Sequence, residues 1–233
     1  NIVLAMEMFE RDVQSSLDAY LTGRTTEADF LAAARPWPRY VTDYRPLVEF
    51  ARGLKWPVVA SDVPRRLASL VSRRGLTTVL DSISATDRAL AARELVCPHD
   101  DYFARFAKTM SDMPSHSGDS ATESAAAKAA TIERIYQAQC IKDETMSESV
   151  ANALAAAPPR ALVVHVNGAF HSDYGLGTAE RVKRRLPGKR VAVVSFVPVS
   201  DLDGANGRSQ HTLADFIVFT LAPPSRANAG PAK

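Results

Sequence analysis

The sequence predicts an α/β protein with a mainly parallel sheet flanked by helices and with an inserted helical segment. Apolar runs of strand length are rich in Val and Ile and nearly continuous, which is typical of strands covered on both faces. These runs are Ile2–Met8, Val58–Ala60, Leu162–Val166, Val191–Val197 and Phe216–Leu221. Helical patterns separate them, and strands that alternate with helices indicate a parallel sheet.

Amphipathic segments predict helices between and after the first two strands. They are Asp12–Thr22, Glu27–Ala34, Pro46–Leu54 and Val63–Arg74. The first carries Val13, Leu17 and Leu21 at spacings of four, which places them on one helical face. Thr26 stands in N-cap position before the second helix, and Gly75 is a stop signal after the last.

A helical insertion is expected at about residues 82–156. Within it, Met113–Ser120 has the composition of a loop, and an Ala-rich helix follows that extends as far as Ala156. We assign residues 1–221 to a single domain. Residues 222–233 contain three prolines and mainly small side chains, so we expect a disordered tail.

Composition excludes several functional classes. Of 233 residues, 28 are Lys or Arg and 26 are Asp or Glu, which gives a net charge of +2. This balance argues against a dedicated nucleic-acid-binding protein, which usually carries a basic face. No apolar run approaches the roughly 18 residues of a membrane span. We therefore expect that this chain does not cross a membrane by itself. Asn1 directly precedes a strand pattern, so we also expect a processed or trimmed N-terminus.

The chain has two cysteines, Cys97 and Cys140. Two cysteines make no disulfide framework, and without Cys-x-x-Cys spacing they support neither structural zinc nor covalent haem attachment. Cys97-Pro98 has the look of a haem-sensing Cys-Pro dipeptide, although such dipeptides are frequent by chance.

Polar side chains follow three predicted strands, at the point where each strand ends. Glu7 ends the first strand, Asp62 ends the second, and His171 comes shortly after the third. Ligands of open α/β sheets bind outside the carboxyl ends of the strands. If the strands are neighbours, these groups converge and could hold a divalent metal or act in acid–base chemistry. Taken singly, Glu7 and Asp62 suit helix N-termini; taken together, the three side chains favour a site.

The long Ala-rich helix carries Gln139 and Asp143 on its apolar stripe. A buried amide and a buried carboxylate are costly unless they meet partners. They either serve the same pocket or bond the helix to a loop, and the sequence favours neither reading.

The glycine-rich loop Gly168–Gly177 contains His171 and Tyr174, both of which can bind metals. Phenolate is a known ligand type for haem iron. The glycine spacing does not fit a dinucleotide-binding loop. The alternative for Tyr174 is an amphipathic wall residue, which is the commoner role of a tyrosine in general.

Short motifs across most of residues 1–200 together resemble one known family. They are Glu7–Gln14, Trp37-Pro38, Asp43–Leu47, Phe50–Arg52, Val58–Arg65, Ala138–Asp143, Met146, Asn167-Gly168, His171 and Asp173–Gly177. This set resembles the ChaN-like haem-binding uptake family, which belongs to a wider group with the Tiki and TraB proteins. Family members normally open with a strand ending in a glycine–glutamate…histidine motif, so we expect one strand and part of the pocket to precede this chain.

The resemblance implies a haem-binding protein of bacterial iron or haem uptake. The protein would be exported, as a periplasmic or membrane-anchored lipoprotein, and haem would lie between the subunits of a homodimer. The implied iron ligand is Tyr174 or Tyr44, and the implied propionate partners are His171, Lys142 or Arg65. The apolar walls that a macrocycle needs are available in Phe9, Trp37, Phe170 and Met146.

More distant relatives are hydrolases, including metal-dependent proteases and macrolide esterases. They imply an alternative in which Glu7, Asp62, Asp143 and His171 bind a divalent metal, or in which Glu7 and His171 act as acid and base. Asp62 stands where the family usually carries Asn, which adds a negative charge to the site. Because no ligand cluster or catalytic triad is fully specified, we favour haem binding over hydrolysis.

Overall fold

The computed structural model describes residues 1–112 and 124–222. The strands are β1 (Ile2–Glu10), β2 (Val58–Asp62), β3 (Leu162–Val166), β4 (Val194–Val199) and β5 (Phe216–Leu221). The α-helices are α1 (Gln14–Leu21), α2 (Glu27–Ala34), α3 (Tyr40–Asp43), α4 (Arg45–Gly53), α5 (Arg65–Arg74), α6 (Leu76–Leu80), α7 (Ala85–Leu90), α8 (Asp101–Asp112), α9 (Ala125–Ala156) and α10 (Gly177–Arg185). Short 3-10 turns are η1 (Arg11–Val13), η2 (Ala169–His171), η3 (Asp173–Gly175) and η4 (Gly207–Gln210).

The central sheet is parallel, with the strand order β2-β1-β3. Leu4 of β1 pairs with Val58 of β2, and Ile2 pairs with Leu162 of β3. Residues 3–9 of β1 are all buried, which explains the continuous apolar run in the sequence. The predicted parallel α/β architecture is confirmed. The carboxyl ends of these strands therefore meet at one edge of the sheet.

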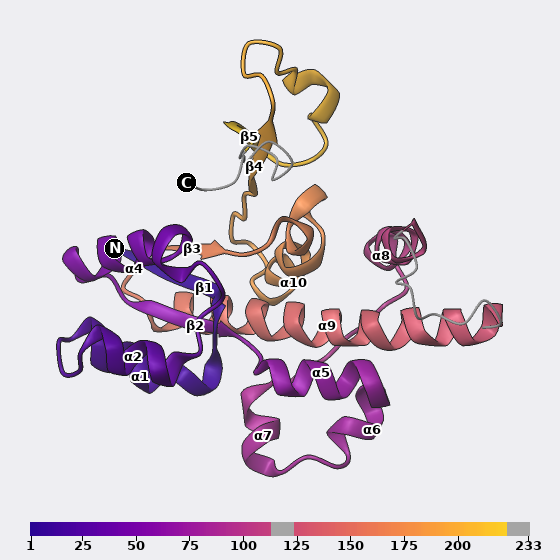
Figure 1. Ribbon diagram of the computed structural model, residues 1–233, viewed down its shortest axis with the longest axis horizontal. Coiled ribbons are helices and arrows are strands. Elements are labelled where there is room, and N and C mark those ends of the chain that lie inside the picture. The colour runs from indigo at the N-terminus through magenta and orange to yellow at the C-terminus, as the bar shows by residue number, and fades with distance from the viewer. Residues whose placement is uncertain (113–123, 223–233) are drawn as a thin grey trace, which may run out of the picture.

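The last two strands depart from the expectation of one sheet covered on both faces. β4 and β5 pair with each other in a separate parallel sheet (Figure 1, top). Val194 pairs with Phe216 and Phe196 with Val218, and all of these side chains are exposed. β3 is an edge strand and also exposes apolar side chains. The expectation of burial was wrong for β3–β5, because a continuous apolar run does not specify whether another layer packs against it.

The long helix α9 is the axis of the molecule. Its 32 residues end at Ala156, as predicted, and Ser124 caps its N-terminus by accepting a hydrogen bond from the N–H of Ala127. At 1.5 Å per residue it is about 48 Å long. α5 packs on one side of it and α10 on the other (Figure 1). Residues 143–147 are all buried, because neighbouring elements surround this part of the helix.

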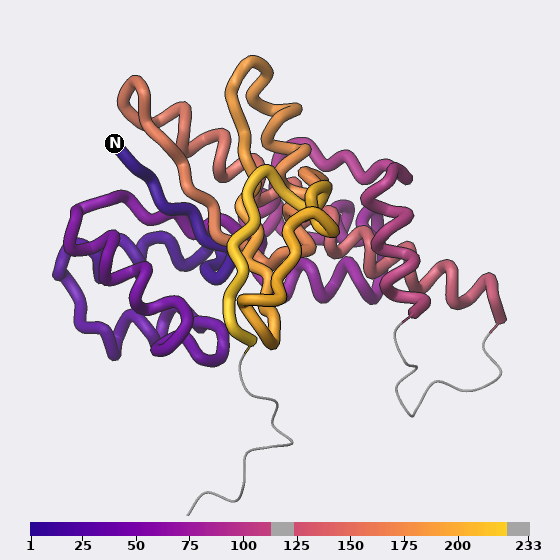
Figure 2. Tube along the Cα trace, turned by 90° about the horizontal axis from the view of Figure 1, so that it is seen from above, coloured from indigo at the N-terminus to yellow at the C-terminus, as the bar shows by residue number. Residues whose placement is uncertain are grey.

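The helical insertion expected at about residues 82–156 corresponds to α7, α8 and α9. The predicted loop at 113–120 and residues 223–233 of the predicted tail lie outside the described residues. Seen from above, the C-terminal segment lies over the middle of the molecule, between the N-terminal part and the helices of the insertion (Figure 2). Within residues 1–112 and 124–222, no helix has both the length and the apolar character of a membrane span.

Candidate functional site

Side chains from the carboxyl ends of the central strands meet, as the sequence predicts. Nε2 of His171 lies 3.3 Å from Oε1 of Glu7. Between Glu7 and Asp62 lies the ammonium group of Lys142, with Nζ 2.9 Å from Oε1 of Glu7 and 3.3 Å from Oδ2 of Asp62. The N–H of Gly168 also donates to Glu7, at 2.6 Å, which ties the loop after β3 to β1.

α9 supplies the other half of this cluster, because Gln139, Lys142 and Asp143 lie on one face of the helix. Asp143 has no exposed surface, and its Oδ1 lies 2.7 Å from Nδ1 of His171. Asp143 thus lies among the strand-end residues and also hydrogen-bonds α9 to the loop after β3. Both interpretations given for this carboxylate in the sequence analysis are therefore correct. We call Glu7, Asp62, Gln139, Lys142, Asp143 and His171 the carboxylate–histidine cluster.

Two hydroxyl groups also donate hydrogen bonds to the carboxylate of Asp143. Tyr102 of α8 donates to Oδ2 at 2.8 Å, and Thr178 of α10 donates to Oδ1 at 2.7 Å. The amide of Gln139 in turn donates to the Tyr102 hydroxyl at 3.0 Å. Neither Tyr102 nor Thr178 was predicted from the sequence, because neither follows a strand and each arrives on a helix placed by tertiary packing.

Charge compensation controls protonation in the cluster. Burial opposes a charge on His171, but Asp143 and Glu7 outweigh it and raise the pKa of His171 to about 10. Burial likewise opposes ionisation of Glu7, but His171 and Lys142 hold its pKa far below the usual range. Burial raises the pKa of Asp62 to about 7 despite the neighbouring Lys142. At neutral pH His171 is therefore an imidazolium that donates hydrogen bonds.

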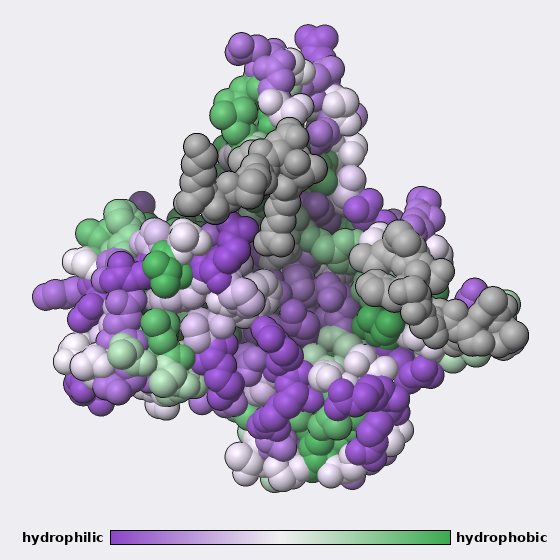
Figure 3. Space-filling view, in the orientation of Figure 1, coloured by the Kyte–Doolittle hydropathy of each residue, from purple (hydrophilic) through white to green (hydrophobic). Residues whose placement is uncertain are grey.

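Solvent reaches the cluster at Lys142 and Gln139, which are both partly exposed. The side chains of His171, Glu7, Asp62 and Asp143 are each at most 7% exposed, whereas that of Lys142 is 23% exposed. Beside Lys142 lies the ring of Trp37, 5.9 Å from Nζ. The space-filling view shows a hydrophilic hollow in the middle of the face that carries α9 (Figure 3).

The two candidate tyrosines lie on different elements. Tyr44 packs edge-to-face against Trp37, with 6.1 Å between ring centroids. Tyr174 lies in the glycine-rich loop with a left-handed φ of 63°, and it is 41% exposed. The guanidinium of Arg105 from α8 stacks 3.7 Å from the centroid of the Tyr174 ring.

The loop that carries Tyr174 depends on Gly177. This residue has a φ of +55°, and a Cβ there would lie 2.6 Å from the carbonyl oxygen of His171. Any larger residue at position 177 would therefore force the loop away from His171.

Other predicted residues lie elsewhere. Arg65 begins α5 and is exposed, and within the described parts of the chain it forms no ion pair. Phe9 and Met146 were expected to line a haem pocket, but both are fully buried in the core. Phe9 packs against Phe30 and Tyr40 instead. The apolar-wall prediction is therefore wrong for Phe9 and Met146.

The cysteines form a disulfide, which was not predicted from the sequence. Cys97 is therefore not available as a Cys-Pro haem ligand in this state. An even pair of cysteines was the only signal for this bond, and the 43-residue separation gives no further indication.

The candidate metal ligands are engaged with one another. Among the residues that the structure describes, no group of three or more His, Cys, Asp or Glu side chains is arranged to hold a metal ion. Between Glu7 and Asp62, Lys142 supplies the positive charge.

Comparisons with known proteins place the chain in a family. Over residues 1–182 the chain matches the family model described as haem-binding uptake, Tiki superfamily, ChaN. It is 26% identical over 235 residues to Protein RETICULATA-RELATED 5, chloroplastic, of Arabidopsis thaliana, covering 97% of this chain and 30% of that protein. The chain thus spans about a third of the length of this curated relative.

Among solved structures, the chain resembles one described as cofacial heme binding to ChaN of Campylobacter jejuni. The TM-score is 0.60, with 14% identity, and the match covers 93% of this chain and 72% of the other. At this identity the likeness shows a shared fold. Since the family model extends over residues 1–182 of 233, the chain belongs to the ChaN family of haem-binding uptake proteins in the Tiki superfamily.

Proposed function

We propose that this protein binds haem at the carboxyl edge of its central sheet, with Tyr174 as the iron ligand. Family membership supports haem as the ligand class. The observation that carries the choice of residue is the exposed ring of Tyr174, held in a loop that Gly177 constrains and stacked by Arg105. Tyrosinate is an established axial ligand of haem iron.

The charges around Tyr174 fit a haem. Arg105 lies on its ring, and Nζ of Lys183 lies against the neighbouring Gly175. These cations can pair with two carboxylates, as the propionates of haem require. His171 and Lys142, the propionate partners implied by the resemblance, are engaged with carboxylates of the cluster. We therefore assign the propionates to Arg105 and Lys183. Arg65, the third implied partner, is exposed at the start of α5.

Tyr44 is the second candidate ligand, because Trp37 beside it offers a flat apolar surface and Lys142 a nearby cation. Burial raises the pKa of Tyr44, so iron would have to displace its proton against that preference. In this proposal a homodimer holds two haems face to face, in keeping with the cofacial heme binding described for ChaN of Campylobacter jejuni. Export to the periplasm on a lipid anchor remains part of the proposal.

The test is an absorption titration with ferric haem on the wild type and on Tyr174→Phe, Tyr44→Phe and Tyr40→Phe. We expect a saturable Soret shift with tyrosinate charge-transfer bands. Tyr174→Phe should remove the bands and weaken binding at least tenfold. The matched control is Tyr40→Phe, since the Tyr40 hydroxyl is buried in the core next to α4 and should leave the spectrum unchanged. Unaltered spectra in both Tyr174→Phe and Tyr44→Phe would refute the ligand assignment.

We also propose a second candidate function, acid–base hydrolysis, which the 2.7 Å contact between His171 and Asp143 favours. The protonated His171 faces the carboxylate of Glu7, with 3.3 Å between Nε2 and Oε1, and such a pair provides a proton donor and a carboxylate side by side. Turnover of ester or peptide substrates that is lost in both Glu7→Gln and His171→Gln would support it. A wild-type protein inert toward such a panel would exclude it.

A further inference from the structure

The disulfide between Cys97 and Cys140 joins the segment that precedes α8 to the helix α9. Before it, the chain is attached to α9 through backbone N–H groups of Ala92 and Arg93, which donate to Thr145 and Glu148. After it, α8 begins only four residues beyond Cys97. The disulfide is therefore the covalent attachment that fixes where α8 begins.

α8 forms one wall of the candidate haem site. Tyr102 donates to Asp143, and Arg105 stacks on Tyr174. The rings of Tyr102 and Phe106 pack against Phe170, with centroids 5.5 Å and 6.0 Å apart. Any displacement of α8 would remove a hydrogen bond from the buried cluster and the cation from the candidate ligand.

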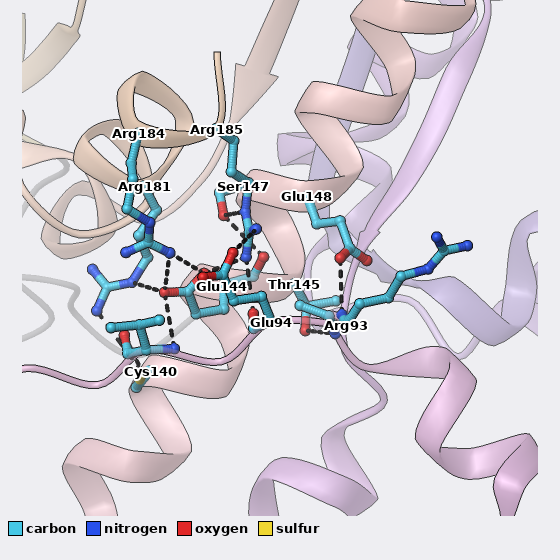
Figure 4. A network of polar contacts seen from close by, with 12 residues as sticks. Arg93, Glu94, Cys140, Glu144, Thr145, Ser147, Glu148, Arg181, Arg184 and Arg185 are labelled. Atoms are coloured by element: carbon cyan, nitrogen blue, oxygen red, sulfur yellow. Dashed lines mark hydrogen bonds and ion pairs between the residues drawn. The ribbon is translucent and has the colours of Figure 1, made fainter. Parts of the chain in front are cut away.

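The two sulfur atoms differ in their surroundings. Cys97 is partly exposed, whereas Cys140 has no exposed surface. Nη2 of Arg181 lies 3.9 Å from Sγ of Cys140 (Figure 4). Because Cys97 has exposed surface and Cys140 has none, we expect an external thiolate to attack Cys97, so that the leaving group is the thiolate of Cys140 beside a guanidinium. A neighbouring cation stabilises a leaving thiolate and so speeds thiol–disulfide exchange.

We propose that the Cys97–Cys140 disulfide is an exchange site for an external dithiol and that its reduction releases α8 from the Asp143–Tyr174 region. One thiolate of the dithiol attacks Sγ of Cys97, the S–S bond breaks, and Cys140 leaves as a thiolate. The second thiol of the dithiol then attacks the mixed disulfide. The protein gains two electrons and two protons and holds two thiols, and the dithiol becomes a disulfide.

Several noncovalent contacts around α8 remain after the disulfide is reduced, so α8 is released only in part. The hydroxyl of Tyr136 still donates to the carbonyl of Pro98, and His99 still lies 2.9 Å from Glu133. The Tyr102–Asp143 bond and the aromatic contacts then hold α8 without covalent support. We therefore expect reduction to increase local opening of α8 without unfolding the sheet.

Hydrogen exchange of the whole chain, oxidised and after treatment with dithiothreitol, tests the release. Thiol titration should find no free thiol before treatment and two after it. Amides of residues 101–112 should exchange at least tenfold faster in the reduced protein than in the oxidised one, and in the reduced protein they should exchange before those of β1, whose exchange reports global unfolding. Equal protection of α8 in both states, or two free thiols in air-oxidised protein, would overturn the proposal.

The role of Arg181 has its own test in the rate of reduction. Arg181→Gln should slow reduction by dithiothreitol about tenfold, Arg181→Lys should restore most of the rate, and Arg73→Gln on α5 should have no effect. If Arg181→Gln does not fold, the rate of Arg181→Lys relative to wild type decides: a rate more than tenfold below wild type contradicts the electrostatic role.

The expected effect on haem binding rests on the proposed function. The experiment distinguishes a failure of the proposed function from a failure of disulfide control. Cys97→Ser/Cys140→Ser should bind haem faster than the oxidised wild type and at the same rate as the reduced wild type. Failure of every form to bind haem would refute the proposed function, while the exchange data would still decide whether the disulfide controls α8. Equal haem-binding rates in the oxidised wild type and the serine variant would refute the control of access.

Discussion

The imidazole of His171 lies 2.7 Å from the carboxylate of Asp143, a group with no exposed surface. The same carboxylate accepts hydrogen bonds from Tyr102 on α8 and Thr178 on α10. The buried carboxylate of Asp143 therefore links the glycine-rich loop, α8 and α10 to one another. Any ligand site at this edge of the sheet depends on its charge.

Replacing Asp143 with Asn should lower the free energy of unfolding by about 3–5 kcal/mol, because it leaves a buried imidazolium with less compensation. Urea unfolding measures the change. Asp112→Asn, on an exposed i,i+4 pair with Lys108, is the control and should cost less than about 1 kcal/mol. Similar losses in the two variants would contradict the central role of Asp143.

The pKa of His171 predicts a pH dependence of stability. It is raised from 6.5 to about 10 in the folded protein, so the stabilisation is fully present below pH 6.5 and is lost as the pH rises toward 10. The free energy of unfolding should fall across this range, and His171→Gln should remove that part of the decline. An imidazole that titrates near 6.5 in the folded protein, observed by NMR, would show the prediction to be wrong.

Glu144 should be the most sensitive carboxylate outside the site. It is fully buried in α9 and pairs with Arg181, Arg184 and Arg185 of α10 (Figure 4). Glu144→Gln removes the buried charge that these guanidinium groups share and should cost about 3–5 kcal/mol of unfolding free energy.

Thermal and urea unfolding of Glu144→Gln can be compared with Glu94→Gln. Among the described residues, Glu94 pairs with Arg185 and with no other cation, and its side chain is 65% exposed, so its loss should change stability by less than about 1 kcal/mol. A Glu144→Gln protein as stable as the Glu94→Gln protein would mean that the arginines find other partners.

Tyr40→Phe should be neutral or should stabilise the protein by about 1 kcal/mol. The Tyr40 hydroxyl is buried and, among the described residues, has no hydrogen-bond partner. In the folded protein it has lost its hydrogen bonds to water without replacement, and the phenylalanine avoids this cost. The contrasting variant is Tyr20→Phe, which loses a hydrogen bond to Glu49 and should destabilise. Differential scanning calorimetry compares the two, and a clearly destabilised Tyr40→Phe protein would indicate a partner for that hydroxyl.

Cys97→Ser/Cys140→Ser should lower the free energy of unfolding by about 4 kcal/mol, because the disulfide closes a loop between residues 43 positions apart. Unfolding of the wild type with and without dithiothreitol should show the same difference. A reductant effect that persists in the double variant would point to a cause other than this bond.

The meeting of Glu7, Asp62 and His171 was predictable from the sequence. Parallel strands present their carboxyl ends at one edge, so polar residues that follow neighbouring strands must lie near each other. The strand bounds Leu162–Val166 and Phe216–Leu221 and the helix bounds Glu27–Ala34 were also correct, because each is delimited by turn residues or by a cap.

Contacts that depend on tertiary packing were not predictable in this way. Tyr102 reaches Asp143 from a helix in the insertion, and no spacing in the sequence relates residue 102 to residue 143. The disulfide likewise joins two residues that only tertiary packing brings together. The separation of β4 and β5 from the central sheet was missed because their composition matches that of buried strands while the layer that would cover them is not encoded in the strands themselves.

The strand order β2-β1-β3 also has a consequence for synthesis of the chain. Ile2 pairs with Leu162, 160 residues later, so one edge of β1 has no partner until β3 leaves the ribosome. At about 5–20 residues per second this interval lasts roughly 8–30 s. During it, the apolar strand β1 presents unpaired backbone groups that can join a strand of another nascent chain. We therefore expect the yield of native protein to depend on chaperones that bind this strand early.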